Sequence, residues 1–122
     1  MQRHYIGQTP AFHRIVAYGP TAYFSGIVAE DGHAPFEVQV DQVLDRLTVM
    51  LSNVAATLDD VLSVTVFVTD MSHKQTLNKV WRERFDHERL PARATVGVSD
   101  LDGPYLIEIS AVAANRLGNV DV

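Results

Sequence analysis

Two charged side chains, Arg93 and Glu108, are the residues of this sequence best suited to chemistry on a small molecule. An arginine guanidinium can bind a carboxylate through two parallel hydrogen bonds, and a glutamate carboxylate can accept a proton from water or from a substrate. One predicted turn, at residues 102–104, lies between the two, so they could converge on neighbouring strands. Together they would form a site for a small acid that reacts with water.

A structural ion pair between Arg93 and Glu108 is the competing interpretation. From residue types alone it is favoured by roughly two to one, because structural ion pairs perturb carboxylates as often as catalytic ones do. Other chemistry has less support. The five histidines lack the spacing of metal ligands, Ser25 lacks the glycine-flanked elbow of a hydrolase nucleophile, and no nucleotide loop is present. The residues themselves therefore give no positive signal for a metal site or a nucleotide site.

The elements that must position these residues follow from hydrophobic periodicity. Helical spacing covers residues 35–57 and 72–87, with Ser72 as the predicted N-cap of the second helix. β-Prone segments cover residues 12–18, 21–29, 61–69, 92–98 and 105–114. This order predicts an α+β fold in one domain, residues 1–122, with a single mixed β-sheet. Both helices should lie on one face, because right-handed crossovers that progress along a sheet in one direction land on the same side.

Strand alternation divides the sheet residues between a helix-covered face and a bare face. The bare set contains Arg93, Thr95 and Glu108 among small and mixed side chains. A sheet face of this kind predicts an oligomer interface or a ligand cavity, although a face simply covered by water remains the alternative. The aliphatic set assigned to the helix-covered face is Leu62, Val64, Val66, Val68, Ala92, Ala94, Val96, Val98, Ile107, Ile109, Ala111 and Ala113.

Composition narrows the possible partners and the compartment. The net charge of −5 disfavours binding to a nucleic-acid backbone, and no apolar run approaches the roughly 18 residues of a membrane span. Cysteine is absent, which fits a cytoplasmic protein. We expect a small-molecule carboxylate substrate, no nucleic acid and no membrane.

Four strings in the second half of the chain resemble, in order and spacing, the signature of the Rid (reactive intermediate deaminase) family, formerly called YjgF. The segment Phe24-Ser25-Gly26 is similar to an N-terminal strand of the same family. The resemblance covers essentially the whole chain. The four strings are Val66-Phe67-Val68-Thr69-Asp70-Met71, Asn78-Lys79-Val80-Trp81, Pro91-Ala92-Arg93-Ala94-Thr95-Val96 and Ile107-Glu108-Ile109.

This resemblance implies a chorismate-mutase-like fold assembled as a homotrimer, with the bare sheet faces inward and the sites in the clefts between subunits. It implies that Arg93 holds the carboxylate of an enamine or imine acid such as 2-aminoacrylate. Glu108 would position or activate the water that releases ammonia and a 2-keto acid, without a cofactor. Five further residues are expected to bind the substrate: Phe12, Ser25, Gly26, Thr95 and Tyr105.

Tyr105 could either pack against the body of the protein or form part of the pocket rim.

Three positions depart from the family pattern. Phe12 replaces a frequent tyrosine, Ile27 a glutamine and Gly97 a glutamate. Loss of the tyrosine hydroxyl and the glutamine amide predicts a less polar pocket, with a substrate larger or more apolar than 2-aminoacrylate. Two alternatives stay open: a non-catalytic ligand-binding or chaperone-like oligomer, and hydrolysis of a different small catabolic metabolite.

Overall fold

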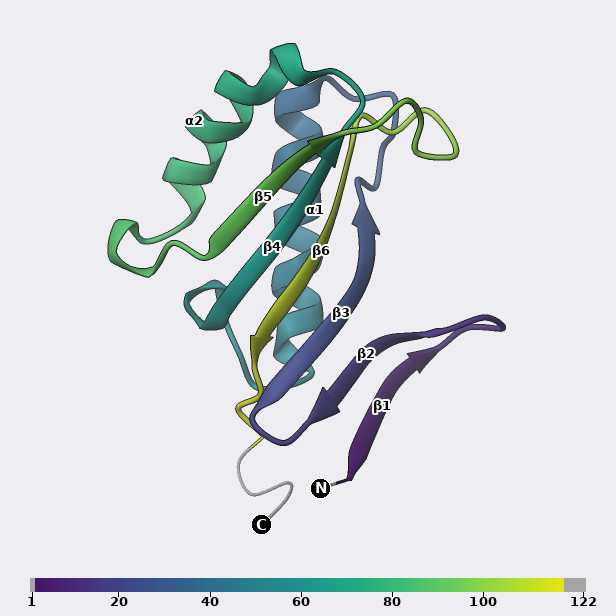
Figure 1. Ribbon diagram of the computed structural model, residues 1–122, viewed down its shortest axis with the longest axis vertical. Coiled ribbons are helices and arrows are strands. Elements are labelled where there is room, and N and C mark those ends of the chain that lie inside the picture. The colour runs from purple at the N-terminus through teal and green to yellow at the C-terminus, as the bar shows by residue number, and fades with distance from the viewer. Residues whose placement is uncertain (1, 118–122) are drawn as a thin grey trace.

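The computed structural model describes residues 2–117 of the chain, and its centre is one mixed sheet (Figure 1). The strands follow the order β1-β2-β3-β6-β4-β5, in which only β4 and β5 are parallel neighbours. Their bounds are β1 Arg3–Gln8, β2 His13–Tyr18, β3 Thr21–Val28, β4 Val61–Val68, β5 Ala92–Gly97 and β6 Ile107–Ala114.

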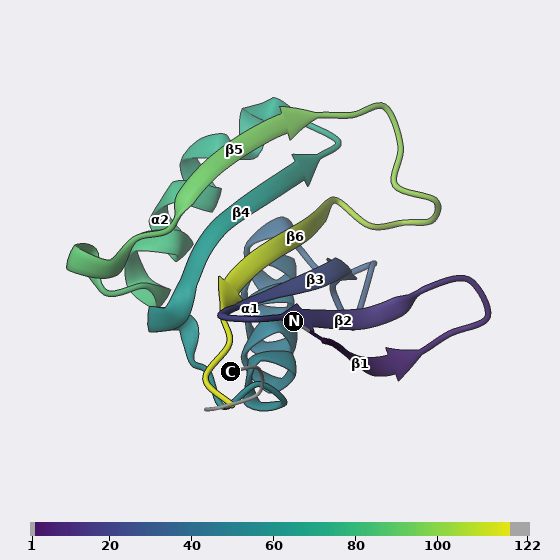
Figure 2. The same ribbon diagram turned by 60° about the horizontal axis from the view of Figure 1, so that its bottom comes forward.

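Two amphipathic helices, α1 Phe36–Ser52 and α2 Lys74–Arg84, cover one face of this sheet. Helix α1 connects β3 to β4, and α2 connects β4 to the parallel strand β5. Figures 1 and 2 show both helices on the same side of the strands, with α2 beside the β5 edge. The predicted α+β architecture is confirmed. None of the helices within residues 2–117 is long and apolar enough to cross a membrane.

Strand β1 was not predicted, because its sequence gives little local signal. It is short, mostly polar and interrupted by Gly7 at φ 75°. It is a strand because it pairs with β2 along the register Arg3↔Tyr18 to Gln8↔His13. Pairing of this kind is a tertiary contact that periodicity within six residues does not reveal.

Both helices are shorter than predicted, and local hydrogen bonds explain where they begin or end. Helix α1 ends at Ser52, and the left-handed Ala55 (φ 56°) then reverses the chain, although the helical spacing continues to the buried Val54. Helix α2 begins at Lys74 after a 3₁₀ turn. That turn is capped by Asp70, whose Oδ1 accepts from the backbone N–H of Ser72 at 2.9 Å, so Ser72 is not the cap.

The core lies between the helices and the covered sheet face, and one polar side chain is fully buried in it. Gln39 donates from Nε2 to the carbonyls of Gly32 (3.0 Å) and Ala34 (2.9 Å), and its Oε1 accepts from the N–H of Leu106 (3.0 Å). This amide therefore ties the loop before α1 to the start of β6, and every polar atom of its side chain is used.

Strand β5 is turned over relative to the prediction. In its parallel register with β4, Arg93 pairs with Val64 and Thr95 with Val66, both of which are buried under the helices. Arg93 and Thr95 therefore lie on the helix-covered side. The bare side of β5 carries the exposed residues Ala92, Ala94 and Val96. Alternation alone could not show this, because β5 is an edge strand whose two faces are both partly open.

Leu62 is the other residue assigned to the wrong face. The register between β4 and β6 shifts between Val61 and Ser63, so Val61 takes the buried place and Leu62 is 54% exposed. The remaining assignments on β4 and β6 are confirmed. Val64, Val66, Val68, Ile107, Ile109, Ala111 and Ala113 are all buried.

Candidate functional site

Glu108 stands on the bare face of the sheet, directly over a bulge in β3. Its backbone lies between Phe67 of β4 and Val28 of β3. The register of β3 with β6 shifts between Phe24 and Ile27, so Ser25 and Gly26 form the bulge. A β-carbon on Gly26 would lie 2.5 Å from Glu108 Oε2, which is closer than real contacts allow. Glycine is therefore required for the carboxylate to lie this close to the β3 backbone.

Ser25 brings an unsatisfied hydroxyl to the same bulge. Its Oγ is buried and finds no hydrogen-bond partner among the described residues. A buried hydroxyl without a partner is uncommon, since leaving it unpaired costs about 1–3 kcal/mol. The bulge thus offers a carboxylate and a free hydroxyl to a small polar molecule.

Arg93 occupies a different environment, on the side of β5 that faces α2. Its Nη2 donates to Asn78 Oδ1 at 2.6 Å, and its guanidinium carbon lies 5.1 Å from the centre of the Trp81 ring. Partial burial lowers the pKa of Arg93, although an arginine stays charged under such conditions. The guanidinium borders a depression of about 310 Å³ lined by Asn78, Trp81, Arg82, Leu90, Pro91 and Arg93.

The structure does not bring Arg93 and Glu108 together within one chain. Glu108 is on the bare face and Arg93 is held against α2 on the covered face, and no ion pair joins them. The expectation that both residues share the bare face is wrong, and so is the alternative that they form a cross-strand salt bridge. Each charged group is held separately and has no counter-ion among the described residues.

The other predicted substrate residues are dispersed. Phe12 closes the β1–β2 hairpin, where the Thr9 side chain bonds its backbone, and its ring is 52% exposed. The hairpin projects away from the rest of the sheet (Figures 1 and 2). Thr95 lies two residues beyond Arg93 on the helix-covered side. Tyr105 packs its ring within contact distance of Gly32 and Gly103, which supports the packing role for this residue.

Two of the three departures from the family pattern have a structural explanation. Ile27 is 4% exposed and belongs to the core beneath α1, so it does not line the face that carries Glu108. Gly97 is exposed, but a β-carbon added there would lie 3.1 Å from Met71 Cγ, which is a tight contact. Ile27 thus leaves the polarity of the face that carries Glu108 unchanged.

Sequence reasoning missed the role of Asn78. Its side chain holds Arg93, and it lies three residues before Trp81, which places both on one side of α2. A polar residue on the stripe that faces the sheet was the available signal. Within residues 2–117 no group of three or more His, Asp or Glu side chains is arranged to hold a metal ion.

Comparison with known proteins gives consistent matches. The family model described as endoribonuclease L-PSP matches residues 4–115. A RutC family protein of Synechocystis is 31% identical over 117 residues, covering 87% of this chain and 90% of the relative. TdcF of Escherichia coli, whose name describes it as a candidate reactive intermediate deaminase, is 32% identical over 105 residues (80% and 81%).

Solved structures agree with the sequence matches. The crystal structure of a YjgF family protein of Neisseria meningitidis superposes with a TM-score of 0.89 at 28% identity, over 95% of this chain and 97% of that one. The matching residues include both strands that carry the candidate site and the helix that holds Arg93. The chain therefore belongs to the Rid family, whose members also go by the names YjgF, RutC and endoribonuclease L-PSP.

Proposed function

We propose that this protein hydrolyses small enamine or imine acids to 2-keto acids and ammonia. The observation that carries the proposal is the Glu108 carboxylate, which is held over the bulge at Gly26 without a counter-ion among the described residues. The relative named as a candidate reactive intermediate deaminase supports the same chemistry. The −5 charge of the chain makes RNA a weaker substrate candidate, despite the name of the matching family model.

The chemistry requires one water and one group that exchanges protons. Glu108 takes a proton from the water as its oxygen attacks the imine carbon, and the carbon–nitrogen double bond becomes a single bond. The same carboxyl then returns the proton to the nitrogen. The attacking oxygen still carries the second proton of the water as a hydroxyl group, and the carboxylate transfers this proton to the nitrogen as well. The carbon–nitrogen bond then breaks, ammonia leaves, and the oxygen becomes the carbonyl of the keto acid. Ser25 Oγ is suited to hold the water or the substrate nitrogen.

Arg93 supplies the binding of the substrate carboxylate in this proposal. Asn78 and Trp81 hold the guanidinium in place, which reduces the conformational entropy lost when it binds an anion. Because Arg93 and Glu108 leave one chain on opposite faces, a single substrate would contact Arg93 of one copy and Glu108 of another. The proposed active form is therefore a homo-oligomer, a trimer by the family resemblance, with its sites between subunits.

The test is the release of ammonia and keto acid from freshly generated imines of several amino acids. We expect Glu108→Gln and Arg93→Ala each to lower kcat/KM by about 100-fold or more, in line with the loss of a general base or a carboxylate anchor. The matched controls are Glu83→Gln and Lys74→Ala, which remove charges of the same sign at exposed positions of α2. They should keep wild-type turnover.

Either of two results would contradict the proposal. Turnover that survives Glu108→Gln in a folded protein would remove the general base. Turnover no faster than buffer with every imine tested would favour the alternative of a ligand-binding oligomer without catalysis.

A further inference from the structure

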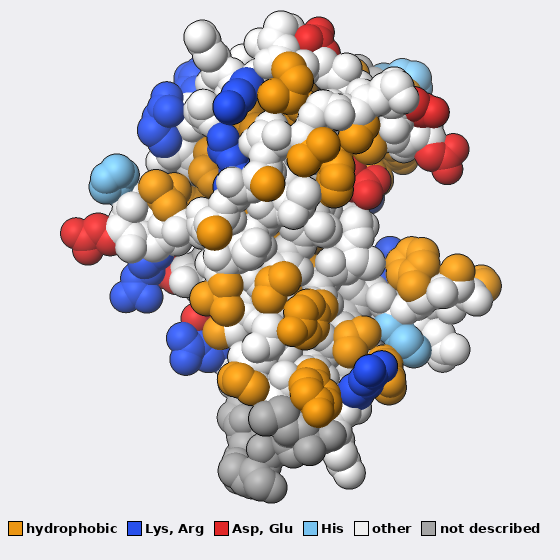
Figure 3. Space-filling view, viewed as in Figure 1, with side chains coloured by type: hydrophobic (Ala, Val, Ile, Leu, Met, Phe, Trp, Pro, Cys, Tyr) orange, Lys and Arg blue, Asp and Glu red, His pale blue; other side chains and the backbone are white. Residues whose placement is uncertain are grey.

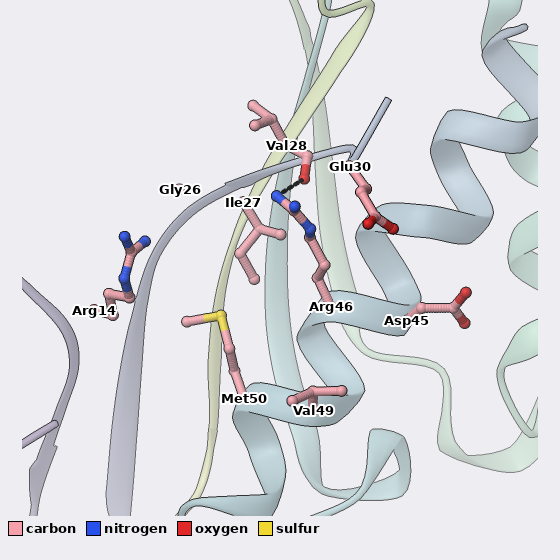
Figure 4. Close-up of a pocket in the computed structure, with 9 residues that line it drawn as sticks. All are labelled: Arg14, Gly26, Ile27, Val28, Glu30, Asp45, Arg46, Val49 and Met50. Atoms are coloured by element: carbon pink, nitrogen blue, oxygen red, sulfur yellow. Dashed lines mark hydrogen bonds between the residues drawn. The ribbon is translucent and has the colours of Figure 1, made fainter. Parts of the chain in front are cut away.

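A groove separate from Arg93 and Glu108 opens where β2 and β3 part. Pairing of these strands ends at Ile15↔Phe24, and beyond this point α1 forms the opposite wall of a space of about 560 Å³ (Figure 4). The β3 backbone from Ser25 onward therefore has no strand partner on this side. The groove is lined by Arg14, Gly26, Ile27, Val28, Glu30, Asp45, Arg46, Val49 and Met50.

Two arginines from different elements give this groove its charge. Arg46 of α1 donates from Nη1 to the Val28 carbonyl at 3.2 Å, and Arg14 of β2 stands on the other side of the β3 segment (Figure 4). Neither guanidinium has an ion-pair partner within residues 2–117. Asp45 cannot neutralise them, because its carboxylate binds Arg84 Nη2 at 2.8 Å and points away from the groove.

The groove wall between these charges is aliphatic. Val49 of α1 is 68% exposed, Met50 lies beside it and points toward β3, and Ile27 forms the floor (Figure 4). An exposed valine on the outer side of an amphipathic helix gains free energy only when another apolar group covers it. The combination of two cations, one uncommitted acid (Glu30) and an aliphatic wall fits an amphipathic anion.

We propose that this groove binds a small aliphatic carboxylic acid, with its carboxylate between Arg14 and Arg46 and its hydrocarbon part on Val49 and Met50. The groove and the Glu108 carboxylate both reach Gly26, so a bound acid would lie next to the bulge that positions Glu108. The proposal does not depend on the deaminase activity, because it uses none of the residues assigned to that reaction except the shared backbone of Gly26.

The experiment is a titration of the full chain with 4-methyl-2-oxopentanoate and, separately, with leucine, followed by calorimetry and by amide chemical shifts. Both acids have the same aliphatic group, and only leucine carries an ammonium. We expect saturable binding, with shifts in residues 26–30 and 45–50. Arg14→Gln should weaken the affinity about tenfold or more, since a hydrogen bond to a charged group is lost.

Three further variants make the result specific. Val49→Glu should weaken binding, because it places a negative charge beside the ligand, while Val38→Glu, exposed on the same helix but outside the groove, should not. Arg93→Ala should leave groove binding unchanged, which separates this site from the deaminase site. If the leucine ammonium contacts Glu30, Glu30→Gln should weaken the binding of leucine and leave the binding of 4-methyl-2-oxopentanoate unchanged.

The outcomes decide the proposal. Binding of either acid that requires Arg14 and is blocked by Val49→Glu supports it. No saturable binding of either acid, or binding that ignores both substitutions or disappears in Arg93→Ala, would overturn it, whatever the imine assay shows.

Discussion

The close approach of Glu108 to Gly26 makes the absence of a side chain at position 26 a requirement for the observed position of the carboxylate. The Glu108 Oε2 occupies the space that a β-carbon would take, at 2.5 Å. The backbone of Gly26 does not have a positive φ. Glycine is needed at this position because it leaves room for the carboxylate, and not because of its backbone freedom. Any larger residue must displace the carboxylate.

We predict that Gly26→Ala lowers turnover of imino acids by about tenfold or more while the protein stays folded. The carboxylate is the flexible end of a side chain and can rotate away at a cost of about 0.5–1.5 kcal/mol. Such a rotation takes it out of position for the water. Steady-state kinetics measures the loss of turnover, and thermal unfolding shows whether the protein stays folded.

A double variant separates displacement of the carboxylate from other damage. If Gly26→Ala acts through Glu108, adding it to Glu108→Gln should lower turnover little further. Additive losses would show that Gly26 acts by another route.

At the scale of single residues, the sequence indicated which residues belong to the candidate site better than it indicated what surrounds them. Arg93, Glu108, Ser25 and Gly26 were all singled out, and the structure places Glu108 over the bulge that Ser25 and Gly26 form. The contacts of Arg93 could not be predicted, because they depend on which way an edge strand faces. Packing against α2 sets which way β5 faces, and the alternation of small residues in β5 does not reveal this orientation.

At the scale of secondary structure, side-chain hydrogen bonds stabilise the tight turn between α1 and β4. Thr57 and Asp60 form a capping box around the 3₁₀ turn Leu58–Asp60, with Asp60 Oδ2 accepting from the Thr57 N–H at 2.9 Å. Asp60 Oδ1 also binds Arg116 Nε at 2.9 Å. The backbone hydrogen bond from Thr57, followed by Arg116, lowers the pKa of Asp60. One carboxylate therefore joins the start of β4 to the chain that follows β6.

We predict that Asp60→Ala lowers the free energy of unfolding by about 1 kcal/mol at pH 7. Because the folded pKa of Asp60 is lowered, its contribution is complete above the ordinary aspartate pKa of about 4 and is lost as the pH falls through the folded pKa. The difference between wild type and variant should therefore shrink below pH 4. Denaturant unfolding at a series of pH values measures it.

Asp59→Ala is the matched control, since Asp59 lies in the same turn but has no ion pair within residues 2–117. It should show a smaller loss at pH 7. A wild-type advantage over Asp60→Ala that persists undiminished to pH 2 would refute this account.

The order of the elements was predictable because periodicity is a local property, whereas the ends of elements depend on single residues. The apolar spacing of α1 continues past Ser52 into Val54, and only the left-handed Ala55 ends the helix. Strand β1 has no apolar stripe and exists through its pairing with β2. The end of α1 thus depends on the backbone conformation of one residue, and β1 depends on its partner strand, and apolar periodicity shows neither.

For the whole molecule, the bare sheet face is the feature that needs a partner. Figure 3 views this face and shows hydrophobic side chains spread over the strands. Tyr5, Tyr18, Tyr23 and Val96 are each more than 40% exposed. A specific interface between copies covers about 800 Å² on each partner, and an exposed apolar face of this kind favours such contact. The predicted homo-oligomer follows from this surface and from the separation of Arg93 and Glu108.

We predict that two inactive variants recover activity when their subunits are mixed. Arg93→Ala keeps Glu108, and Glu108→Gln keeps Arg93. If each site takes Arg93 from one subunit and Glu108 from its neighbour, some sites in a mixed oligomer contain both native residues. Unfolding the two proteins together and refolding them should restore a fraction of wild-type turnover, whereas each variant refolded alone stays inactive.

A third variant tests whether the recovery requires assembly through the bare face. Ala94 is exposed on that face of β5, opposite Thr65 of β4, so Ala94→Arg places a long charged side chain in the proposed interface. Adding it to both partners should give monomers by light scattering and remove the recovery. Recovery in monomers would mean that assembly through the bare face is not required. No recovery in intact mixed oligomers would mean that both residues act within one subunit. Arg93 would then have to leave Asn78 and Trp81 and pass around the β5 edge, and Asn78→Ala, which frees it, should raise turnover instead of lowering it.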